Sequence, residues 1–300
     1  MSRFTILGDW GTTRLRLWQM TDGEITGQSE GPGIGALTLS PAATLREAMV
    51  PLIAGTTPDR IVLCGMAGAR NGLHEAPYAE CAATAETWAR ECARLDFDGV
   101  PAFIAAGLAA HDSARNTHDV MRGEETQVFG ALMLHPALQH GRHQLVLPGT
   151  HAKWVTIEEG QVTGLRTFIT GELFALLGRS SLLATGPNSD KSGQNDGFAA
   201  GLEQAQSGGG LSGALFTARS AQLRQSRSPG WAKGYLSGLL IGHELAEIKT
   251  LPRAVTVIAA GGLSGHYLAA MTAFGVTGHA LDGDACSLAG LELLNQRTLP

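Results

Sequence analysis

The sequence has 300 residues, of which 44% are apolar and 16% are charged, with a formal net charge of −5. A chain of this length more often builds two hydrophobic cores than one. The charge is spread along the whole length, which excludes the basic surface needed to bind nucleic acid or an anionic membrane. We therefore expect a small molecule as partner, with no nucleic acid and no membrane.

Three further features of the composition narrow the class of protein. No apolar run approaches the ~20 residues of a membrane span, and the N-terminus lacks the pattern of a signal peptide, so we expect a cytoplasmic protein. The four cysteines lack metal or redox spacing, and we expect reduced thiols. The 40 glycines cluster beside apolar runs, which is typical of a backbone that approaches a ligand closely.

The N-terminal half alternates between predicted strands and helices. Residues 3–7 and 15–18 are apolar or alternating runs around a glycine-bearing turn, so the chain opens with a β-hairpin. Apolar spacing then predicts helices at 41–53 and 85–95, with a buried strand at 60–64 between them. This alternation indicates an α/β fold.

The second half repeats the opening layout. Predicted strands at 144–148 and 154–157 enclose a second glycine-bearing turn, and a further strand is predicted at 162–169. The remaining predicted elements are a surface loop at 204–213, a strand at 254–260 and helices at 267–274 and 286–294.

The segment 135–143 is rich in Pro, Gly and polar residues, which is typical of a domain boundary. We therefore expect an N-terminal domain at 1–140 and a C-terminal, nucleotide-binding domain at 141–285. The last helix, within 286–300, is expected to pack on the N-terminal domain.

The turn of the first hairpin carries Asp9, Gly11, Thr12 and Thr13. Glycine and small hydroxyl residues let backbone N–H groups and hydroxyls approach phosphate oxygens, and a carboxylate can hold hydrated Mg²⁺. A plain hairpin turn would explain Gly11 alone, whereas the two threonines and the following Arg16 favour a phosphate site. We expect this turn to bind the phosphates of ATP, with Asp9 bound to Mg²⁺ through water.

The turn of the second hairpin carries Gly149, Thr150, His151 and Lys153. In the same strand-turn-strand setting, its backbone could meet the β and γ phosphates of ATP. Taken alone, this motif is equally consistent with an ordinary turn, and Lys153 with a side chain that points to solvent. The interpretation as a phosphate site is supported because this turn repeats the layout of the first hairpin.

A third glycine signal, Gly261 and Gly262, follows the predicted strand at 254–260. A flat adenine ring that stacks against backbone requires the absence of side chains, and ligands of α/β sheets bind at the carboxyl ends of strands. Two glycines after a strand are also common in plain turns. We expect an adenosine-binding motif here.

The order of these three motifs resembles the phosphate-1, phosphate-2 and adenosine motifs of the sugar kinase, hsp70 and actin superfamily. The detailed sequence is similar to the 2-dehydro-3-deoxygalactonokinase family, and departs from it at Leu73, where a Trp is expected, and at 179–181, where a histidine is expected. The resembling stretches are 7–16, 65–70, 75–78, 121–127, 147–154, 170–174 and 236–242.

This resemblance implies two ribonuclease-H-like domains of the actin-like ATPase fold with a cleft between them. It also implies ATP-dependent phosphorylation of 2-dehydro-3-deoxy-D-galactonate at its 6-hydroxyl, in galactonate breakdown, with ATP and Mg²⁺. Two alternatives stay open: a kinase of another small sugar acid or an aminosugar, and a non-catalytic ATP-binding regulator. A homodimer is also left open.

Transfer of a phosphoryl group to an alcohol requires a carboxylate near the attacking hydroxyl. In related sugar kinases a Gly-Asp at the start of a helix supplies the catalytic base, and Gly123-Glu124 resembles it. Glu124 is therefore our candidate base, and Glu125 is the alternative. Both glutamates could instead only stabilise the N-terminus of the helix through its dipole.

The expected substrate is itself an anion, so its site requires a cation. Arg16, Arg70 and Arg122 are the candidates, because a guanidinium can hold a carboxylate through two hydrogen bonds. Three further residues are candidates for binding the sugar hydroxyls: Glu75, Tyr78 and Glu172.

Overall fold

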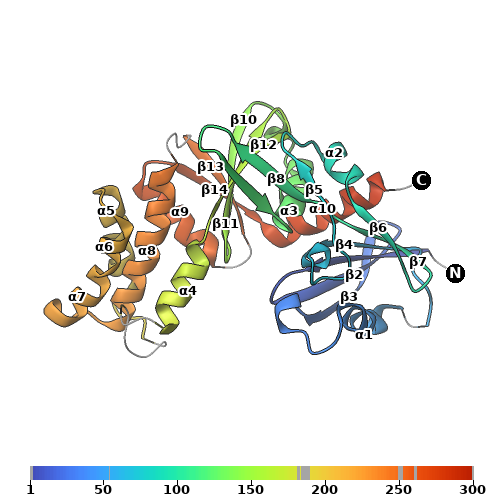
Figure 1. Ribbon diagram of the computed structural model, residues 1–300, viewed down its shortest axis with the longest axis horizontal. Coiled ribbons are helices and arrows are strands. Elements are labelled where there is room, and N and C mark those ends of the chain that lie inside the picture. The colour runs from blue at the N-terminus through green and yellow to red at the C-terminus, as the bar shows by residue number, and fades with distance from the viewer. Residues whose placement is uncertain are drawn as a thin grey trace. The chain divides into compact units, whose positions relative to one another are not determined.

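The computed structural model describes residues 3–53, 55–180, 183, 190–248, 253–259 and 262–298 (Figure 1). The chain forms two compact units. The first comprises Met1–Arg142, Val155–Arg166 and Asp282–Pro300, and the second comprises His143–Trp154 and Thr167–Leu281. The domain boundaries expected from the sequence, at 1–140 and 141–285, remain a prediction.

The first unit is built on a six-stranded sheet of order β3-β2-β1-β4-β7-β6. β1 runs antiparallel to β2 and parallel to β4, so the predicted opening hairpin and the predicted buried strand are both confirmed. The strands of this sheet are β1 Phe4–Trp10, β2 Arg14–Thr21, β3 Glu24–Pro32, β4 Arg60–Gly65, β6 Ala93–Phe97 and β7 Val100–Ile104.

Helices cover this sheet. α1 (Pro41–Ile53), which coincides with the predicted helix, packs on β2 and β3 and buries Leu45, Met49 and Leu52 in the core. α3 (Glu124–Leu134) and α10 (Gly283–Arg297) pack on each other, and Figure 1 shows α10 above the sheet with α1 below it. Glycines permit this close contact, because a Cβ at Gly130 would lie 1.9 Å from the carbonyl oxygen of Cys286.

The predicted helix at 85–95 is correct only in its first part. α2 (Ala85–Arg90) begins at a capping box in which Thr84 and Thr87 bond reciprocally. The chain then forms β6, which pairs with β7 through a tight turn where Asp98 and Gly99 have positive φ. This long-range pairing overrides the helical pattern of the sequence. A small sheet of order β5-β8-β9 (Tyr78–Glu80, Gly107–Asp112, Thr117–Met121) and three 3-10 turns, η1 Ile34–Ala36, η2 Met66–Gly68 and η3 Pro136–Gln139, complete the unit.

The second large sheet has the order β12-β11-β10-β13-β14, with β10 parallel to β13. Its first four strands follow the order of β3-β2-β1-β4, which confirms the predicted repeat of the opening layout. The strands are β10 Arg142–Leu147, β11 Ala152–Glu158, β12 Gln161–Phe168, β13 Ala254–Ala259 and β14 Thr277–Asp282. The two sheets are the ribonuclease-H-like layers expected of the actin-like fold.

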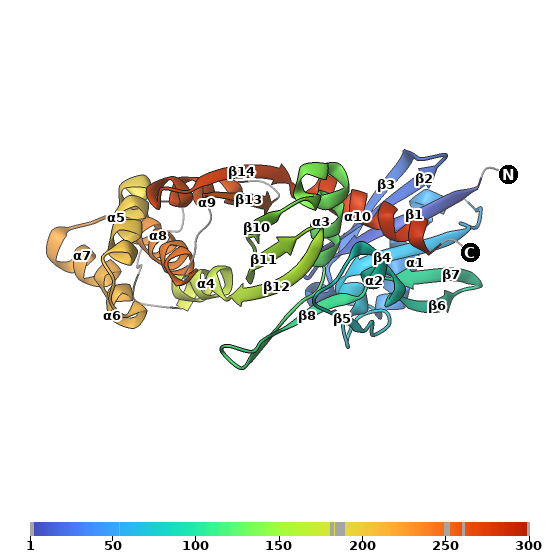
Figure 2. The same ribbon diagram turned by 90° about the horizontal axis from the view of Figure 1, so that it is seen from above.

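Helices dominate the rest of the second unit, and α5 and α8 run side by side in both views (Figure 2). A Cβ at Gly197 or Gly201 would lie 2.0 or 2.2 Å from a carbonyl oxygen of α8, and a Cβ at Gly234 would lie 2.0 Å from a carbonyl oxygen of α5. The helices are α4 Thr170–Ser180, α5 Gln194–Gln206, α6 Leu211–Leu215, α7 Thr217–Gln225, α8 Pro229–Glu247 and α9 Leu263–Ala273. The surface loop predicted at 204–213 is therefore too long, since α5 and α6 occupy both of its ends.

All four cysteines lie among the described residues and are free thiols, as expected. Within the described part of the chain, no helix combines the length and the apolar character that a membrane crossing requires.

Candidate active site

The turn between β1 and β2 is exposed and tightly supported. The N–H of Gly11 donates to the carbonyl of Arg14 at 2.8 Å, and the N–H of Gly35 donates to the carbonyl of Thr12 at 2.9 Å. A Cβ at Gly33 would lie 2.3 Å from that same carbonyl oxygen, so only glycine fits beneath the turn. The side chains of Thr12 and Thr13 remain exposed to solvent. The turn is therefore a fixed loop with small hydroxyls at its surface, as a phosphate site requires.

Arg16 on β2 holds the carboxylate of Asp9. Its Nη2 lies 2.6 Å from Asp9 Oδ2, while its Nη1 pairs with Asp284 at the start of α10. The Asp9 and Arg16 side chains are only 16% and 12% exposed, so the pair is partly shielded from water. Both ends of the guanidinium are engaged, and this geometry favours a role in orienting Asp9 over a contact with a substrate carboxylate.

Two glycine backbones bring Asp9 close to the start of α3. Gly65, at the end of β4, has φ +71°, and a Cβ there would lie 2.6 Å from the carbonyl oxygen of Trp10 and 3.5 Å from Asp9 Oδ1. Gly123, with φ +107°, is so close that its Cβ would lie 3.3 Å from the Cα of Gly65. Positive φ at both positions is a conformation that favours glycine. The backbones at the end of β4 and just before Glu124 therefore approach each other closely beside Asp9.

The adjacent acids Glu124 and Glu125 begin α3 but occupy different environments. Glu124 is partly exposed, and its Oε2 accepts from the N–H of Arg122 at 3.2 Å. Glu125 is fully buried; its carboxylate accepts from the N–H of Gly123 at 2.6 Å and from Thr126 Oγ1 at 3.1 Å. Burial, followed by the charge of Glu124, raises the pKa of Glu125 to about 8. Glu125 therefore supports the helix start from within, while Glu124 reaches the surface.

Arg122 and Arg70 differ sharply in environment. Arg122 donates through Nη2 to the carbonyl of Ala76 at 2.7 Å, and its guanidinium lies 4.3 Å from the centre of the Tyr78 ring. Its Nη1 is buried without a hydrogen-bond partner. Arg70, by contrast, is 90% exposed in a loose ion pair with Glu75. Arg122 is thus the better positioned of these two cations for a substrate anion.

In the second unit, the turn after β10 is locked to the first turn of α4. The N–H of Glu172 donates to the carbonyl of Thr150 at 2.8 Å, and a Cβ at Gly171 would lie 2.2 Å from the carbonyl oxygen of Gly149. His151 Nε2 lies 2.6 Å from Glu172 Oε2, with both side chains about half exposed. Glu172 is therefore tied to the turn after β10 through both Thr150 and His151.

Lys153, on β11, is 6% exposed, and its Nζ donates to Thr167 Oγ1 at 3.1 Å. The alternative of a solvent-facing Lys153 is wrong, because the side chain turns inward.

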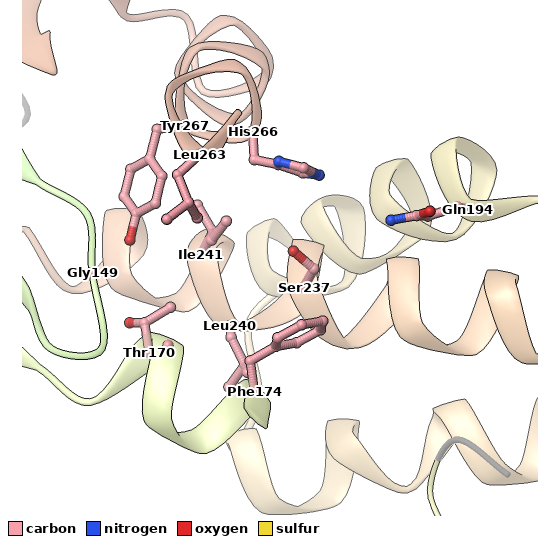
Figure 3. Close-up of a pocket in the computed structure, with 11 residues that line it drawn as sticks. Gly149, Thr170, Phe174, Gln194, Ser237, Leu240, Ile241, Leu263, His266 and Tyr267 are labelled. Carbon is pink, nitrogen blue, oxygen red and sulfur yellow. The ribbon is translucent and has the colours of Figure 1, made fainter. Parts of the chain in front are cut away.

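A pocket opens beside this turn (Figure 3). Its volume is about 160 Å³. It is lined by Gly149, Thr170, Gly171, Phe174, Gln194, Ser237, Leu240, Ile241, Leu263, His266 and Tyr267. A neighbouring cavity of about 460 Å³ shares Gln194, Ser237 and His266 and also contacts Gly262. Between them, the two cavities are lined by Gly149 of the turn after β10 and by Gly262 at the start of α9. Gly261 lies outside the described residues.

Sequence reasoning missed several residues of this pocket, and beneath them a buried acid, Glu244. Trp154, Thr170 and Tyr267 all donate to its carboxylate. The available signal was an acid, Glu244, inside the apolar pattern of α8 and ahead of its last residue, Glu247, since glutamate is rarely buried without partners.

Two sheets of matching strand order, each with a glycine-bearing turn after its first strand, define the class of this protein: it has the ATPase and sugar kinase fold. Phosphoryl transfer in general uses carboxylates to hold Mg²⁺ and to orient the nucleophile.

The chain belongs to the 2-keto-3-deoxy-galactonokinase family, whose model matches residues 9–294. It is 34% identical to the 2-dehydro-3-deoxygalactonokinase of Escherichia coli, and 35% identical to a Rhizobium meliloti protein named as a probable enzyme of this kind. Each alignment covers 94% of both chains. A crystal structure of a Sinorhizobium meliloti protein named for the same activity has a TM-score of 0.86 and 31% identity, covering 99% of this chain and 97% of that one. The predicted family resemblance is confirmed.

Proposed function

We propose that this protein transfers the γ-phosphoryl group of ATP to the 6-hydroxyl of 2-dehydro-3-deoxy-D-galactonate. The product would be the 6-phosphate, within D-galactonate catabolism. Family membership over nearly the whole chain supports the reaction. The observation that carries it in the structure is the close approach of Gly65 and Gly123, which places Asp9 beside the start of the helix that bears Glu124.

Each unit carries one candidate phosphate-binding turn. The first unit offers the turn at Gly11, Thr12 and Thr13 to the phosphates, and the second unit offers the turn at Gly149 and Thr150. The two adjoining cavities of the second unit would take the adenosine, with apolar side chains for the base and polar groups at Gln194, Ser237 and His266. ATP is the nucleotide that the kinase family uses.

Asp9 fits the role of an Mg²⁺ residue. Its Oδ2 is held by Arg16, and its Oδ1 lies close to Gly65, where a Cβ would come within 3.5 Å of it. Mg²⁺ usually keeps several waters and binds one or two carboxylates together with phosphates, so a single, partly exposed carboxylate next to a candidate phosphate turn suits it. The ion would neutralise the charge on the phosphates of ATP.

Glu124 would orient the attacking hydroxyl and accept its proton. It is the more exposed of the two adjacent acids, whereas Glu125 is enclosed and its two oxygens are used by Gly123 and Thr126. A base must lie within hydrogen-bond reach of the proton it removes. Glu125 does not meet that condition, because no solvent reaches its side chain.

For the carboxylate of the sugar acid, we propose Arg122. Its side chain is partly exposed, and its stacking on Tyr78 and its bond to Ala76 fix the orientation of the guanidinium. Arg70 and Glu75 lie on the exposed loop after η2, and their ion pair is loose enough to be rearranged by a ligand.

The test is coupled ADP release with 2-dehydro-3-deoxygalactonate, its gluconate-derived epimer and several aldonates. Wild type, Glu124→Gln and the exposed control Glu86→Gln would be compared. Turnover on the galactonate-derived acid that falls at least about 100-fold in Glu124→Gln alone is the expected result. Silence on every acid with ATP still bound would favour another acceptor or a regulatory role instead.

A further inference from the structure

Glu244 on α8 accepts hydrogen bonds from three different elements. Its Oε1 accepts from Trp154 Nε1 on β11 at 2.6 Å, and its Oε2 accepts from Thr170 Oγ1 at the start of α4 at 2.5 Å and from Tyr267 Oη on α9 at 2.9 Å. The side chain is only 2% exposed. A buried carboxyl is costly unless its hydrogen bonds are made. This acid is therefore built into the unit by three specific donors rather than by apolar packing.

The three donors belong to the elements that shape the proposed nucleotide pocket. Thr170 and Tyr267 line the pocket themselves, and Figure 3 shows both on the same side of it as Gly149. Trp154 lies on β11, which follows the second phosphate turn directly. That turn rests on α4, because Gly171, the residue after Thr170, packs against the carbonyl of Gly149. A shift of any of these elements would change both the turn and the pocket wall.

We propose that Glu244 is a positioning residue for the nucleotide, which sets nucleotide affinity by fixing the second phosphate turn against the wall formed by α4 and α9. This inference rests on the proposed function, since it requires that the pocket binds ATP. Glu244 itself is not among the residues that line the pocket, so it acts through Thr170 and Tyr267.

The charge of Glu244 is not what the role requires. Burial, opposed by the bonds from Thr170, Trp154 and Tyr267, raises its pKa to about 7. Either protonation state can keep the contacts, because the hydroxyls of Thr170 and Tyr267 can accept a hydrogen bond as well as donate one. A glutamine can do the same, with its oxygen toward Trp154 and its amide toward the two hydroxyls. Glu244→Gln is therefore the conservative variant that should rescue function.

A matched control variant distinguishes a role of Glu244 in nucleotide binding from a role in stability alone. Leu245 is the next residue of α8, is fully buried, and packs in the same apolar core as Trp154 and Tyr267, but its side chain makes no hydrogen bond. Leu245→Ala removes core packing and lowers stability, as large-to-small changes in a core do. The Leu245→Ala substitution keeps Glu244, so Trp154, Thr170 and Tyr267 can still donate to its carboxyl.

The experiment measures ADP and AMPPNP binding by calorimetry, together with KM for ATP and for the sugar acid. We expect Glu244→Ala to weaken nucleotide binding and to raise the KM for ATP by about 10-fold or more, with the KM for the sugar acid unchanged. Glu244→Gln and Leu245→Ala should stay within about twofold of wild type. Tyr267→Phe, which keeps the ring but loses one donor, should weaken binding by about 3- to 10-fold, and it provides the test if Glu244→Ala does not fold.

The outcomes that overturn the inference are distinct from those that overturn the proposed function. Unchanged nucleotide affinity in Glu244→Ala, or an equal loss in Leu245→Ala, would make Glu244 a structural residue only. Unchanged affinity in Tyr267→Phe would do the same if Glu244→Ala fails to fold. A wild-type protein that binds no nucleotide would refute the proposed function, and the inference with it.

Discussion

Replacing Glu125 with glutamine should make the first unit more stable at alkaline pH. The folded protein holds a proton on this carboxyl up to about pH 8, because burial and then the charge of Glu124 raise its pKa, whereas the unfolded chain releases it near the ordinary value of 4.5. Between these two values the folded state binds the extra proton. Its stability therefore falls as pH rises through this window and is constant above it.

The size of the effect follows from the width of that window. One pKa unit corresponds to about 1.4 kcal/mol, so ionisation of Glu125 lowers the free energy of unfolding by roughly 3 to 5 kcal/mol between pH 4.5 and 8. Glutamine carries no proton to lose. Its oxygen can accept from the N–H of Gly123, and its amide can donate to the hydroxyl of Thr126, so both existing contacts keep a partner.

The assay is urea unfolding followed by tryptophan fluorescence from pH 5.5 to 8.5. The stability of Glu125→Gln relative to wild type should rise by roughly 3 kcal/mol across this range. Glu86→Gln, which changes an exposed acid at the start of α2 in the same unit, should show an offset of less than about 1 kcal/mol that does not grow with pH. If the difference in free energy of unfolding between Glu125→Gln and wild type also stays constant with pH, the argument that this carboxyl is neutral in the folded protein is refuted.

Three further variants test the site and the packing. Asp9→Asn should lower kcat at least about 100-fold while ATP binding in the presence of EDTA is unchanged, as measured by calorimetry. Arg122→Lys should raise the KM for the sugar acid about 10-fold or more without changing the KM for ATP, because an ammonium cannot replace the fixed guanidinium plane; steady-state kinetics with each substrate varied would show it. Gly130→Ala should cost about 3 kcal/mol or more in urea unfolding, because its Cβ would overlap the carbonyl oxygen of Cys286, whereas the control Gly164→Ala, with open space around it, should stay within about 1 kcal/mol.

The hairpins could be predicted from the sequence because their determinants are local. Apolar alternation on both sides of a glycine-bearing turn specifies β1 and β2, and again β10 and β11, without knowledge of any distant contact. The prediction failed at 91–95, where a helical pattern was overridden when β6 paired with β7. Helix α1, whose apolar face simply covers the sheet, was predicted with its correct bounds.

The residues of the candidate site likewise fall into those with a local sequence signal and those whose role depends on distant contacts. Glycine turns and adjacent acids are visible in the sequence, so the residues at 9–13 and 123–125 could be singled out there. Which of the two acids is buried depends on the packing of α3, and the sequence left that choice open. Glu244 could not be assigned a role from its own surroundings, because its three donors lie 90, 74 and 23 residues away along the chain.

The high glycine content has two physical origins, of which the sequence suggested only one. Some glycines leave backbone open to a ligand, as we propose for Gly11 in the turn between β1 and β2. Many others let backbones touch each other: α8 carries Gly230, Gly234, Gly238 and Gly242 at intervals of four residues, and a Cβ at any of them would lie within 2.6 Å of a neighbouring atom. That spacing places them on one face of the helix, and three of the four face α5. Because α8 also carries Glu244 and lines the pocket through Ser237 and Leu240, this close packing holds the wall of the proposed nucleotide site in place.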